Sequence, residues 1–336
     1  MSHQLQTERV LPNAGKNTHP GEHLAEWTQR LHRVRENIRR VVVGQEHAVE
    51  LILIALLSGG HVLMEDVPGT GKTTLAATLA KSLNLSFGRI QFTPDVMPSD
   101  ITGYNVYNPQ RSEFEFHPGA VMCQVLLADE INRSSPKTQS ALLEAMQDRQ
   151  VTVDGTSYSL KAPFLVLATQ NNLEQLGTYP LPEAQLDRFM LKFSLGYPKL
   201  DEEISILSLH AKGSPIHNLT PVLSETEILA MQEACRSIHV AESILRYVAL
   251  IAERSRQMPE FKLGVSPRGS LLLLQAAKAR AMLSGRNYVI PQDIQDLAPY
   301  VLAHRLILSE TAQLAERDAA TLTRTLLTTV PVPPAR

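Results

Sequence analysis

The segment from residue 61 to residue 74 carries the side chains whose types and spacing point most directly to chemistry, and it reads HVLMEDVPGTGKTT. An apolar run typical of a buried strand leads into a Pro/Gly turn, after which Gly71, Lys72 and Thr73 open a helix. A phosphate-binding loop requires this order, because glycines let backbone N–H groups face a polyphosphate and the helix N-terminus adds positive potential. We expect Lys72 to reach the β- and γ-phosphates and the Thr73 hydroxyl to hold Mg²⁺.

This segment departs from the strict pattern G-x-x-x-x-G-K-[ST] at one position, where Asp66 replaces glycine. Aspartate tolerates a left-handed backbone better than most residues, so we expect the turn to form. The alternative is a glycine-rich turn that caps an ordinary helix. The residues that we assign to the phosphate and nucleotide site are Gly44, Gln45, Asp66, Val67, Pro68, Gly69, Thr70, Gly71, Lys72, Thr73 and Thr74.

A second chemical centre follows the apolar run of residues 125–128, which ends in Asp129 and Glu130. The pattern indicates a buried parallel strand, and ligands of open α/β sheets bind at the carboxyl edge of such strands. Mg-nucleotide chemistry needs one carboxylate near the metal, for which we assign Asp129 together with Thr73. It also needs a carboxylate that orients or deprotonates the attacking water, for which we assign Glu130. The alternative is a strand that ends in two solvated acids.

Two further polar residues follow apolar strands. Asn171 comes after the strand expected at residues 164–169, where its amide would bind a γ-phosphate or the attacking water, or would simply start a loop. Arg188 comes just before a short strand expected at residues 190–193. It is either a structural ion-pair partner of Asp187 or Glu183, or an arginine finger directed at the nucleotide of another subunit.

The remaining pattern places these residues in a two-part chain. Apolar residues at helical spacing predict an amphipathic helix at residues 22–40, whose arginine-rich face is either solvated, which we favour, or in contact with a neighbouring subunit. Alternating patterns predict hairpins at residues 104–116 and 150–158. After Pro198 only helical periodicity remains, with one helix expected at residues 309–328. We expect a flexible tail (1–21), the helix (22–40), an α/β nucleotide domain (41–197), an all-α lid (198–328) and a C-terminal tail (329–336).

Composition narrows the class of protein. The chain has 336 residues, 43% of them hydrophobic and 20% charged, which is ordinary for a globular protein. Its net charge of -2 provides no overall basic field for nucleic acid. The two cysteines, Cys123 and Cys235, have no metal-ligand spacing, and we expect both to be core residues in a reducing compartment. No apolar run reaches membrane-spanning length and the N-terminus has no secretion signal, so we expect a cytoplasmic protein without membrane insertion.

Taken together, these motifs resemble those of the AAA+ ATPases, and closely those of the MoxR family, over about residues 41–306. The phosphate loop is similar to Walker A, and residues 125–130 are similar to Walker B. The two expected hairpins resemble the helix-2 insert and the pre-sensor-1 hairpin. Asn171 matches sensor 1, Arg188 matches the arginine finger, and Arg268 in the run GVSPR matches sensor 2.

The resemblance implies an α/β fold with a five-stranded parallel sheet, an all-α lid and a hexameric ring with ATP and Mg²⁺ between subunits. It gives catalytic roles to Glu130, Asn171, Arg188 and Arg268, with Arg188 acting on the neighbouring subunit's nucleotide and Arg268 coupling phosphate loss to lid rotation. It further implies a chaperone-like remodelling or maturation factor, with metal-cofactor insertion among its roles. The expected partners are a protein with a von Willebrand factor A domain and a protein client.

Three alternatives remain at this point. A nucleic-acid motor of the same clade would favour a basic hairpin, whereas the 104–116 hairpin carries Arg111 against Glu113 and Glu115, and we therefore expect no nucleic-acid partner. A metal-chelatase ATPase subunit would share the fold and the lid. A nucleotide-gated scaffold would bind ATP without turnover, which the presence of Glu130 and Arg188 argues against.

Overall fold

The computed structural model describes residues 20–65, 69–171, 177–211 and 215–334. Five parallel strands form its central sheet, in the order β2-β5-β8-β1-β9. This arrangement confirms the predicted α/β fold. The strands are β1 (Val62–Glu65), β2 (Phe87–Gln91), β5 (Val125–Asp129), β8 (Leu165–Gln170) and β9 (Leu191–Phe193).

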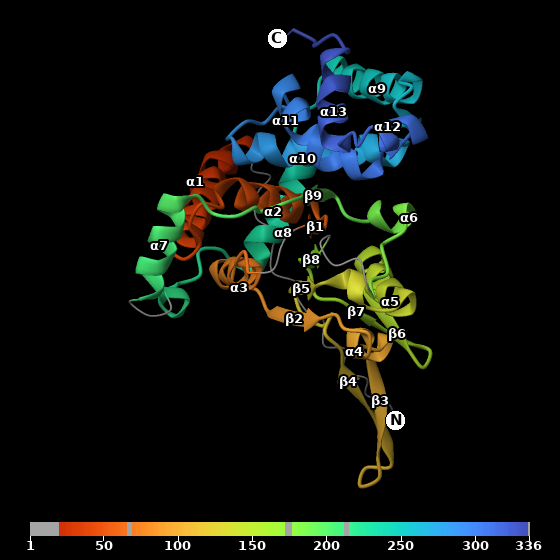
Figure 1. The fold of residues 1–336 in the computed structure, drawn as a ribbon. Coiled ribbons are helices and arrows are strands. Elements are labelled where there is room, and N and C mark those ends of the chain that lie inside the picture. Colours follow the sequence, from red (N-terminus) through yellow and green to blue (C-terminus); the bar gives the residue numbers. More distant parts are fainter. Residues whose placement is uncertain (1–19, 66–68, 172–176, 212–214, 335–336) are drawn as a thin grey trace, which may run out of the picture.

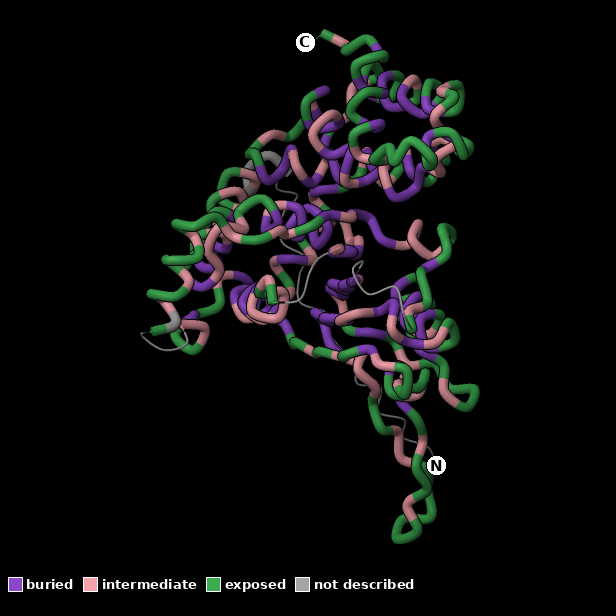
Figure 2. Tube along the Cα trace, in the orientation of Figure 1, coloured by how far each residue is buried: buried purple, intermediate pink, exposed green. Residues whose placement is uncertain are grey.

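Helices cover both faces of this sheet, which explains why its inner strands are apolar without interruption. Met64 and Leu127 face a core that includes α2 (Glu46–Ser58) and α3 (Lys72–Ser82). Their sequence neighbours on the same strands point to a second core formed with α5 (Pro136–Asp148). β2 lies at the edge of the sheet, and its residues alternate between intermediate and exposed. Apart from this edge strand, the sheet is packed between the two cores and forms the buried centre of the molecule (Figure 2).

The helix predicted at residues 22–40 is present as α1 (Pro20–Arg39). Its apolar stripe is buried in the same core cluster as α2 and α3. The Asn37 Nδ2 atom donates to Ser82 Oγ and to the Thr220 carbonyl oxygen, both at 3.0 Å. Three arginines of its polar face form ion pairs within the chain: Arg30 with Glu26 and Glu227, Arg35 with Glu50, and Arg39 with Glu46. That face thus contacts the chain's own elements as well as solvent.

Both predicted hairpins are present, and they contact each other. The first consists of β3 (Gly103–Asn108) and β4 (Glu113–Pro118), follows the short α4 (Pro98–Thr102), and projects from the body of the molecule (Figure 1). The second consists of β6 (Gln150–Val153) and β7 (Thr156–Ser159). The rings of Phe116 and Tyr158 stack with centroids 3.9 Å apart, and Asn105 Nδ2 donates to Asp154 Oδ2 at 2.9 Å. These contacts join the base of the projecting hairpin to the second hairpin.

A mostly helical part of the chain, which contains a helical lid, follows the sheet from α7 to α13. Its elements are α7 (Leu200–His210), η2 (Pro215–Asn218), α8 (Glu225–Arg236), α9 (Glu242–Gln257), β10 (Phe261–Leu263), α10 (Pro267–Leu283), α11 (Pro291–Leu302), η3 (Ala303–Arg305), β11 (Ile307–Leu308), α12 (Glu310–Leu314) and α13 (Ala319–Thr328). The antiparallel pair β10–β11 was not predicted, because strands of two or three residues carry no readable period. None of the described helices is long and apolar enough to cross a membrane.

The single helix expected at residues 309–328 is wrong, since the structure divides it into α12 and α13. The break contains Glu316, whose φ of 48° places it in the left-handed region that ends a helix. Asp318 then begins α13, and its carboxylate accepts a hydrogen bond from the Thr321 N–H at 2.8 Å. An aspartate whose carboxylate accepts a hydrogen bond from the N–H three residues later marks the start of a helix. The continuous helical periodicity of residues 309–328 concealed this signal.

The two cysteines are buried and unpaired, as predicted. Burial raises the pKa of each thiol to about 12, so both stay protonated and unreactive at neutral pH. His61 is buried at the start of β1, where its Nδ1 atom accepts from the Val166 N–H at 3.0 Å and its Nε2 atom lies 3.2 Å from the Met146 carbonyl oxygen. Burial lowers the pKa of His61 to about 4, so the ring is neutral and structural.

Candidate functional site

The described part of the phosphate loop has the backbone that a turn around an anion requires. Gly69 and Gly71 have φ values of 86° and 84°, in the left-handed region that residues with a Cβ rarely occupy. Gly71 is the N-cap of α3, and having no side chain it leaves the approach to the helix N-terminus open on its own side. The predicted site residues Asp66, Val67 and Pro68 lie outside the described residues. Lys72 and Thr73 occupy the first turn of α3.

A cavity of about 200 Å³ lies beside this loop. It is lined by Val41, Val42, Val43, Gln45, Gly69, Thr70, Gly71, Thr74, Leu75, Leu195, Pro198 and Ile206. The structure thus brings five of the predicted residues together with an apolar wall, a combination that suits a flat aromatic base next to a phosphate chain. Gly44 does not line the cavity. Its φ is 77°, and a Cβ at this position would lie 2.5 Å from the Glu202 side chain, so Gly44 lets the start of α7 approach.

The two carboxylates predicted from sequence lie at the carboxyl edge of the sheet, where β5 ends. Asp129 Oδ1 accepts from Thr169 Oγ1 at 2.7 Å, and its Oδ2 forms an ion pair with Arg89 Nη2 at 2.8 Å. Arg89 and Thr169 belong to β2 and β8, the strands on either side of β5. The orientation of Asp129 is therefore set by both neighbouring strands, and neither partner was identified from the sequence.

Glu130 has a left-handed backbone, with φ of 57°, directly after β5. Its N–H donates to Thr169 Oγ1 at 2.8 Å, which fixes the turn. Its Oε2 atom accepts from Gln91 Nε2 at 2.8 Å and from Arg133 Nη1 at 2.9 Å. In this arrangement two side chains hold the carboxylate. Gln91 was missed because its role depends on the pairing of β2 with β5, which a single strand pattern does not reveal.

Asn171 lies at the same edge, directly after β8, and is 4% exposed. Asn132 holds its backbone: Asn132 Nδ2 donates to the Asn171 carbonyl oxygen at 3.1 Å, and Asn132 Oδ1 accepts from the Asn171 N–H at 3.4 Å. Gln139 Nε2 donates to the Tyr179 carbonyl oxygen at 2.9 Å. Asn132, in η1 (Ile131–Arg133), is therefore a positioning residue that the sequence reasoning did not single out.

Arg188 lies between the one-turn helix α6 (Glu183–Leu186) and β9. Asp187, one of its two predicted ion-pair partners, is engaged by other residues: Arg305 Nε lies 2.7 Å from Oδ1 and Arg268 Nε lies 3.1 Å from Oδ2. The alternative in which Arg188 pairs with Asp187 is therefore not observed, because two lid arginines occupy that carboxylate. No ion pair among the described residues includes Arg188. Arg268, the predicted sensor 2, is half exposed at the start of α10.

Arg305 is the most deeply buried charge of this region, with 3% of its side chain exposed. Burial lowers its pKa to about 10, and the carboxylate of Asp187 opposes that shift, so Arg305 stays protonated at neutral pH. The neighbouring His304 has its Nε2 atom 3.1 Å from the Phe189 carbonyl oxygen, and its Nδ1 atom is buried with no hydrogen-bond partner among the described residues. Burial, and then the charge of Arg305, lower the pKa of His304 well below its ordinary value, so this ring is neutral.

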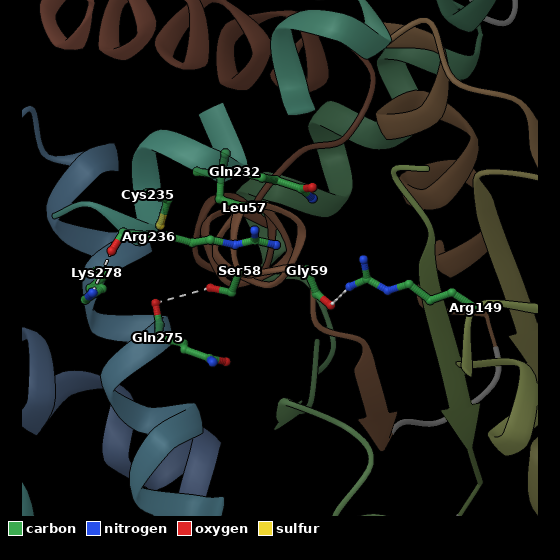
Figure 3. Close-up of a pocket in the computed structure, with 9 residues that line it drawn as sticks. All are labelled: Leu57, Ser58, Gly59, Arg149, Gln232, Cys235, Arg236, Gln275 and Lys278. Carbon is green, nitrogen blue, oxygen red and sulfur yellow. Dashed lines mark hydrogen bonds between the residues drawn. The ribbon is translucent and has the colours of Figure 1, made fainter. Parts of the chain in front are cut away.

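A second cavity, of about 280 Å³, lies away from the phosphate loop, at the C-terminal end of α2 (Figure 3). Three cations line it, but two of them are bound to backbone carbonyl oxygens at helix ends. Arg149 Nη2 donates to Gly59 O at 3.1 Å, and Lys278 Nζ donates to Arg236 O at 2.7 Å. Cations at helix C-termini offset the negative end of the helix dipole, so Arg149 and Lys278 have a structural role here. No predicted site residue lines this cavity.

The strand order, the phosphate loop before α3, the paired carboxylates after β5 and the helical lid define a class, the P-loop ATPases of the AAA+ type. Comparisons with known proteins agree with that class. Residues 61–191 match the family described as "ATPase family associated with various cellular activities (AAA)", and residues 253–325 match the AAA lid domain. A crystal structure of a protein from Cytophaga hutchinsonii superposes with a TM-score of 0.87 at 38% identity, covering 93% of this chain and 98% of that one.

Named relatives identify the family within this class. The chain is 41% identical to Chaperone MoxR1 of Mycobacterium tuberculosis, over 93% of this chain and 85% of that protein. It is 31% identical to Protein MoxR of Paracoccus denitrificans, over 93% of this chain and 99% of that protein. It is also 51% identical to YeaC of Bacillus subtilis, over 89% of this chain and 93% of that protein. The chain belongs to the MoxR family of AAA+ ATPases.

Proposed function

We propose that this protein hydrolyses ATP with Mg²⁺ and uses the cycle to remodel or mature a partner protein complex, with metal-cofactor insertion as one such task. The observation that carries the proposal is the meeting, at one edge of the sheet, of the phosphate loop, the carboxylates after β5 and Asn171 after β8. This is the edge where ligands of parallel α/β sheets bind. The apolar cavity beside the loop fits the base of the nucleotide.

Each residue at this edge has a role that its chemistry supports. Lys72 and the N–H groups at the start of α3 bind phosphate oxygens. The hydroxyl of Thr73 and the carboxylate of Asp129 are the oxygen donors that Mg²⁺ prefers, and these residues would hold it. When bound, the ion neutralises phosphate charge. Glu130 orients and deprotonates the attacking water, once its carboxylate leaves Gln91 and Arg133, and Asn171 fixes the water or the γ-phosphate.

We further propose that the site is completed by a second copy of the chain in a hexameric ring. Arg188 lies beyond the sheet edge next to β9, on a segment held by the lid, and would supply positive charge to the neighbouring subunit's nucleotide. Arg268, on the lid, would sense the nucleotide and couple phosphate loss to lid movement near Tyr197 and Pro198. The proposed domains, residues 41–197 and 198–328, contain the two family matches.

A protein client is favoured over nucleic acid by the surface of the projecting hairpin. Tyr107 and Phe114 are 51% and 71% exposed, and their rings meet edge to face. Arg111 is paired with Glu115 at 2.9 Å, so its charge is offset and the hairpin offers no basic finger for phosphates. Relatives named MoxR and Chaperone MoxR1 support a chaperone-like role. The proposed partner is a protein with a von Willebrand factor A domain.

The first test replaces the proposed catalytic carboxylate by its amide. Glu130→Gln should bind ATP normally and lose phosphate release, because the amide keeps the shape but accepts no proton. Glu144→Gln makes the same change on the exposed face of α5 and serves as the matched control, with unchanged turnover. Undiminished phosphate release by Glu130→Gln would contradict the assigned role.

The same variant, loaded with Mg-ATP, would then be purified from its native cells as a trap. Mass spectrometry and nuclease-sensitive absorbance would identify what accompanies it. A protein with a von Willebrand factor A domain, or an immature enzyme complex, would support the remodelling function. Nuclease-sensitive material without a specific protein would favour the nucleic-acid motor, and a tetrapyrrole-binding partner would favour the chelatase subunit.

A further inference from the structure

Arg305 binds the backbone on both sides of Arg188. Its Nη2 atom donates to the carbonyl oxygens of Asp187, at 3.0 Å, and of Phe189. Its Nη1 atom donates to the Met190 carbonyl oxygen at 3.4 Å, and its Nε atom donates to the Asp187 carboxylate at 2.7 Å. One lid side chain thus holds residues 187–190, which we call the Arg188 segment, at four acceptors, while the Arg188 side chain takes no part in these contacts.

The Arg188 segment is also anchored in the nucleotide domain. Phe189 is fully buried in the core formed with α5, and Met190 is buried in the core on the other face of the sheet. The Met190 N–H donates to the His61 carbonyl oxygen at 2.8 Å, just before β1. The segment therefore connects two bodies: its side chains pack on the sheet, and its carbonyl oxygens are bound by the lid.

The chemistry of this contact is specific to arginine. The guanidinium has five N–H donors in a rigid plane, and here its three nitrogens reach separate acceptors around one turn of backbone. A lysine at this position would keep the charge but would present a single nitrogen on a flexible stem, which cannot bridge carbonyl oxygens that face different directions. The lid thus fixes the direction of the segment as well as its place.

We propose that Arg305 is a positioning residue for ATP hydrolysis: by holding the Arg188 segment, it sets where Arg188 stands in the neighbouring subunit's site. This inference rests on the proposed function, in which Arg188 acts in trans. A displacement of about 1 Å of a group that acts on the transition state can cost about 10²-fold in rate. Movement of the lid in one subunit is thereby transmitted to hydrolysis in the next.

The test uses mixed rings, because a residue that acts in trans is rescued by a neighbour and a residue that acts in its own site is not. Arg305→Lys alone should lower kcat for ATP by about 10²-fold, with KM for ATP changed less than about threefold. Mixed with Glu130→Gln subunits, which are inactive but carry an intact Arg188 segment, Arg305→Lys subunits should regain turnover well above the sum of the two separate preparations. No gain on mixing would overturn the proposal.

Two further preparations keep the outcomes distinct. Arg188→Ala mixed with Glu130→Gln tests the trans action itself: if that mixture stays inactive, the ring mechanism of the proposed function fails, and this inference fails with it. If it recovers while the Arg305→Lys mixture does not, only this inference fails. Arg317→Lys, at an exposed lid arginine, is the matched control and should retain full turnover without mixing.

Arg305 is buried, so the lysine variant requires a check that it folds. Circular dichroism and the assembly state measured by light scattering provide it. If Arg305→Lys does not fold, Asp187→Asn removes the charge pair and leaves the carbonyl contacts of Arg305 in place. Asp187→Asn should show a smaller kcat loss. Mixing with Glu130→Gln should restore the part that comes from the Arg188 segment, while any part that comes from Arg268, which also pairs with Asp187, remains. A loss of which mixing restores nothing would overturn the proposal.

Discussion

The nucleotide edge of the sheet and the junction between Arg305 and the Arg188 segment both gather charged side chains, but they are assembled differently. At the edge, Glu130 and Asn171 each follow a strand, and the pairing of β5 with β8 brings those strand ends together. At the junction, Arg305 and Asp187 are 118 residues apart and meet only because the lid packs on the Arg188 segment. The comparison shows that the side chains proposed for catalysis are placed by short local motifs. The contact between the lid and the Arg188 segment depends instead on packing between distant elements.

Two buried, neutral histidines, His61 and His304, both contact the Arg188 segment, and they differ in how completely their ring nitrogens are hydrogen-bonded. His61, at the amino end of β1, has a partner for each ring nitrogen. His304, at the junction, has a partner at Nε2, while its Nδ1 atom is buried without one among the described residues. His61 is therefore a fully hydrogen-bonded part of the core, whereas His304 retains one unsatisfied ring nitrogen.

The largest expected effect breaks the link between the two regions at Arg188. Arg188→Ala should lower ATP turnover by about 10³- to 10⁵-fold, or about 4 to 7 kcal/mol of transition-state stabilisation, because an arginine finger acts on charge that develops in the transition state. Nucleotide affinity, measured with a fluorescent ATP analogue, should change little. Arg236→Ala, an exposed arginine paired with Glu233, is the control and should keep its turnover. A large loss of affinity would show that Arg188 binds its own chain's nucleotide instead.

The next effect tests the two hydrogen bonds of the buried His61 ring. His61→Phe should lower the free energy of unfolding by about 3 kcal/mol, because it leaves the Val166 N–H and the Met146 carbonyl oxygen buried without their partner, at about 1 to 3 kcal/mol each. Urea unfolding followed by circular dichroism measures it. A loss below about 1 kcal/mol would mean that water or a shifted strand replaces the imidazole.

The cost of His61→Phe should also depend on pH. Burial lowers the pKa of His61 from its ordinary 6.5 to about 4, so as pH falls the unfolded chain takes up the proton first. The stability that neutral His61 provides is therefore full above about pH 6.5 and is lost as pH falls toward 4. Between pH 7 and pH 5 the difference between wild type and His61→Phe should shrink by about 2 kcal/mol. A difference that stays constant would place the pKa of His61 near its ordinary value.

The smallest effect is expected at the second histidine. His304→Phe should change the free energy of unfolding by less than about 1 kcal/mol, because the Phe189 carbonyl oxygen keeps Arg305 as a donor and the unpartnered Nδ1 atom is removed. The same urea titration measures it beside His61→Phe. Equal losses of stability in the two variants would show that the unpartnered nitrogen of His304 makes no difference to what each histidine contributes.

Much of the nucleotide edge could be read from the sequence, because its elements are long or strongly patterned. The apolar runs that became β1, β5 and β8 were predicted within a residue or two, and the polar residues that follow them meet at one edge. What the sequence did not show were the partners that orient them. Arg89 and Gln91 contact Asp129 and Glu130 because β2 pairs with β5, and that register is a property of the sheet.

The elements of the lid were predicted less accurately from the sequence, for physical reasons. Helical periodicity predicted most of its helices, but β10 and β11 are too short to show a period, and the left-handed Glu316 interrupts a pattern that otherwise continues. Arg305 lies in a 3-10 turn after α11, where nothing local distinguishes it from a surface arginine. Its importance appears only when the lid is placed against the Arg188 segment.

The sequence by itself determined the phosphate loop, the strands and the polar residues that end them, because backbone preferences and burial on both faces of a parallel sheet act over a few residues. Only the tertiary structure decided which charges meet. An ion pair of Arg188 with Asp187 was one of the alternatives, yet the Asp187 carboxylate is bound by Arg268 and Arg305. The buried guanidinium of Arg305 must find several acceptors, and the packing of the lid brings it to this carboxylate. A charged group that becomes buried on folding needs hydrogen-bond partners, and the packing of distant segments decides which groups supply them.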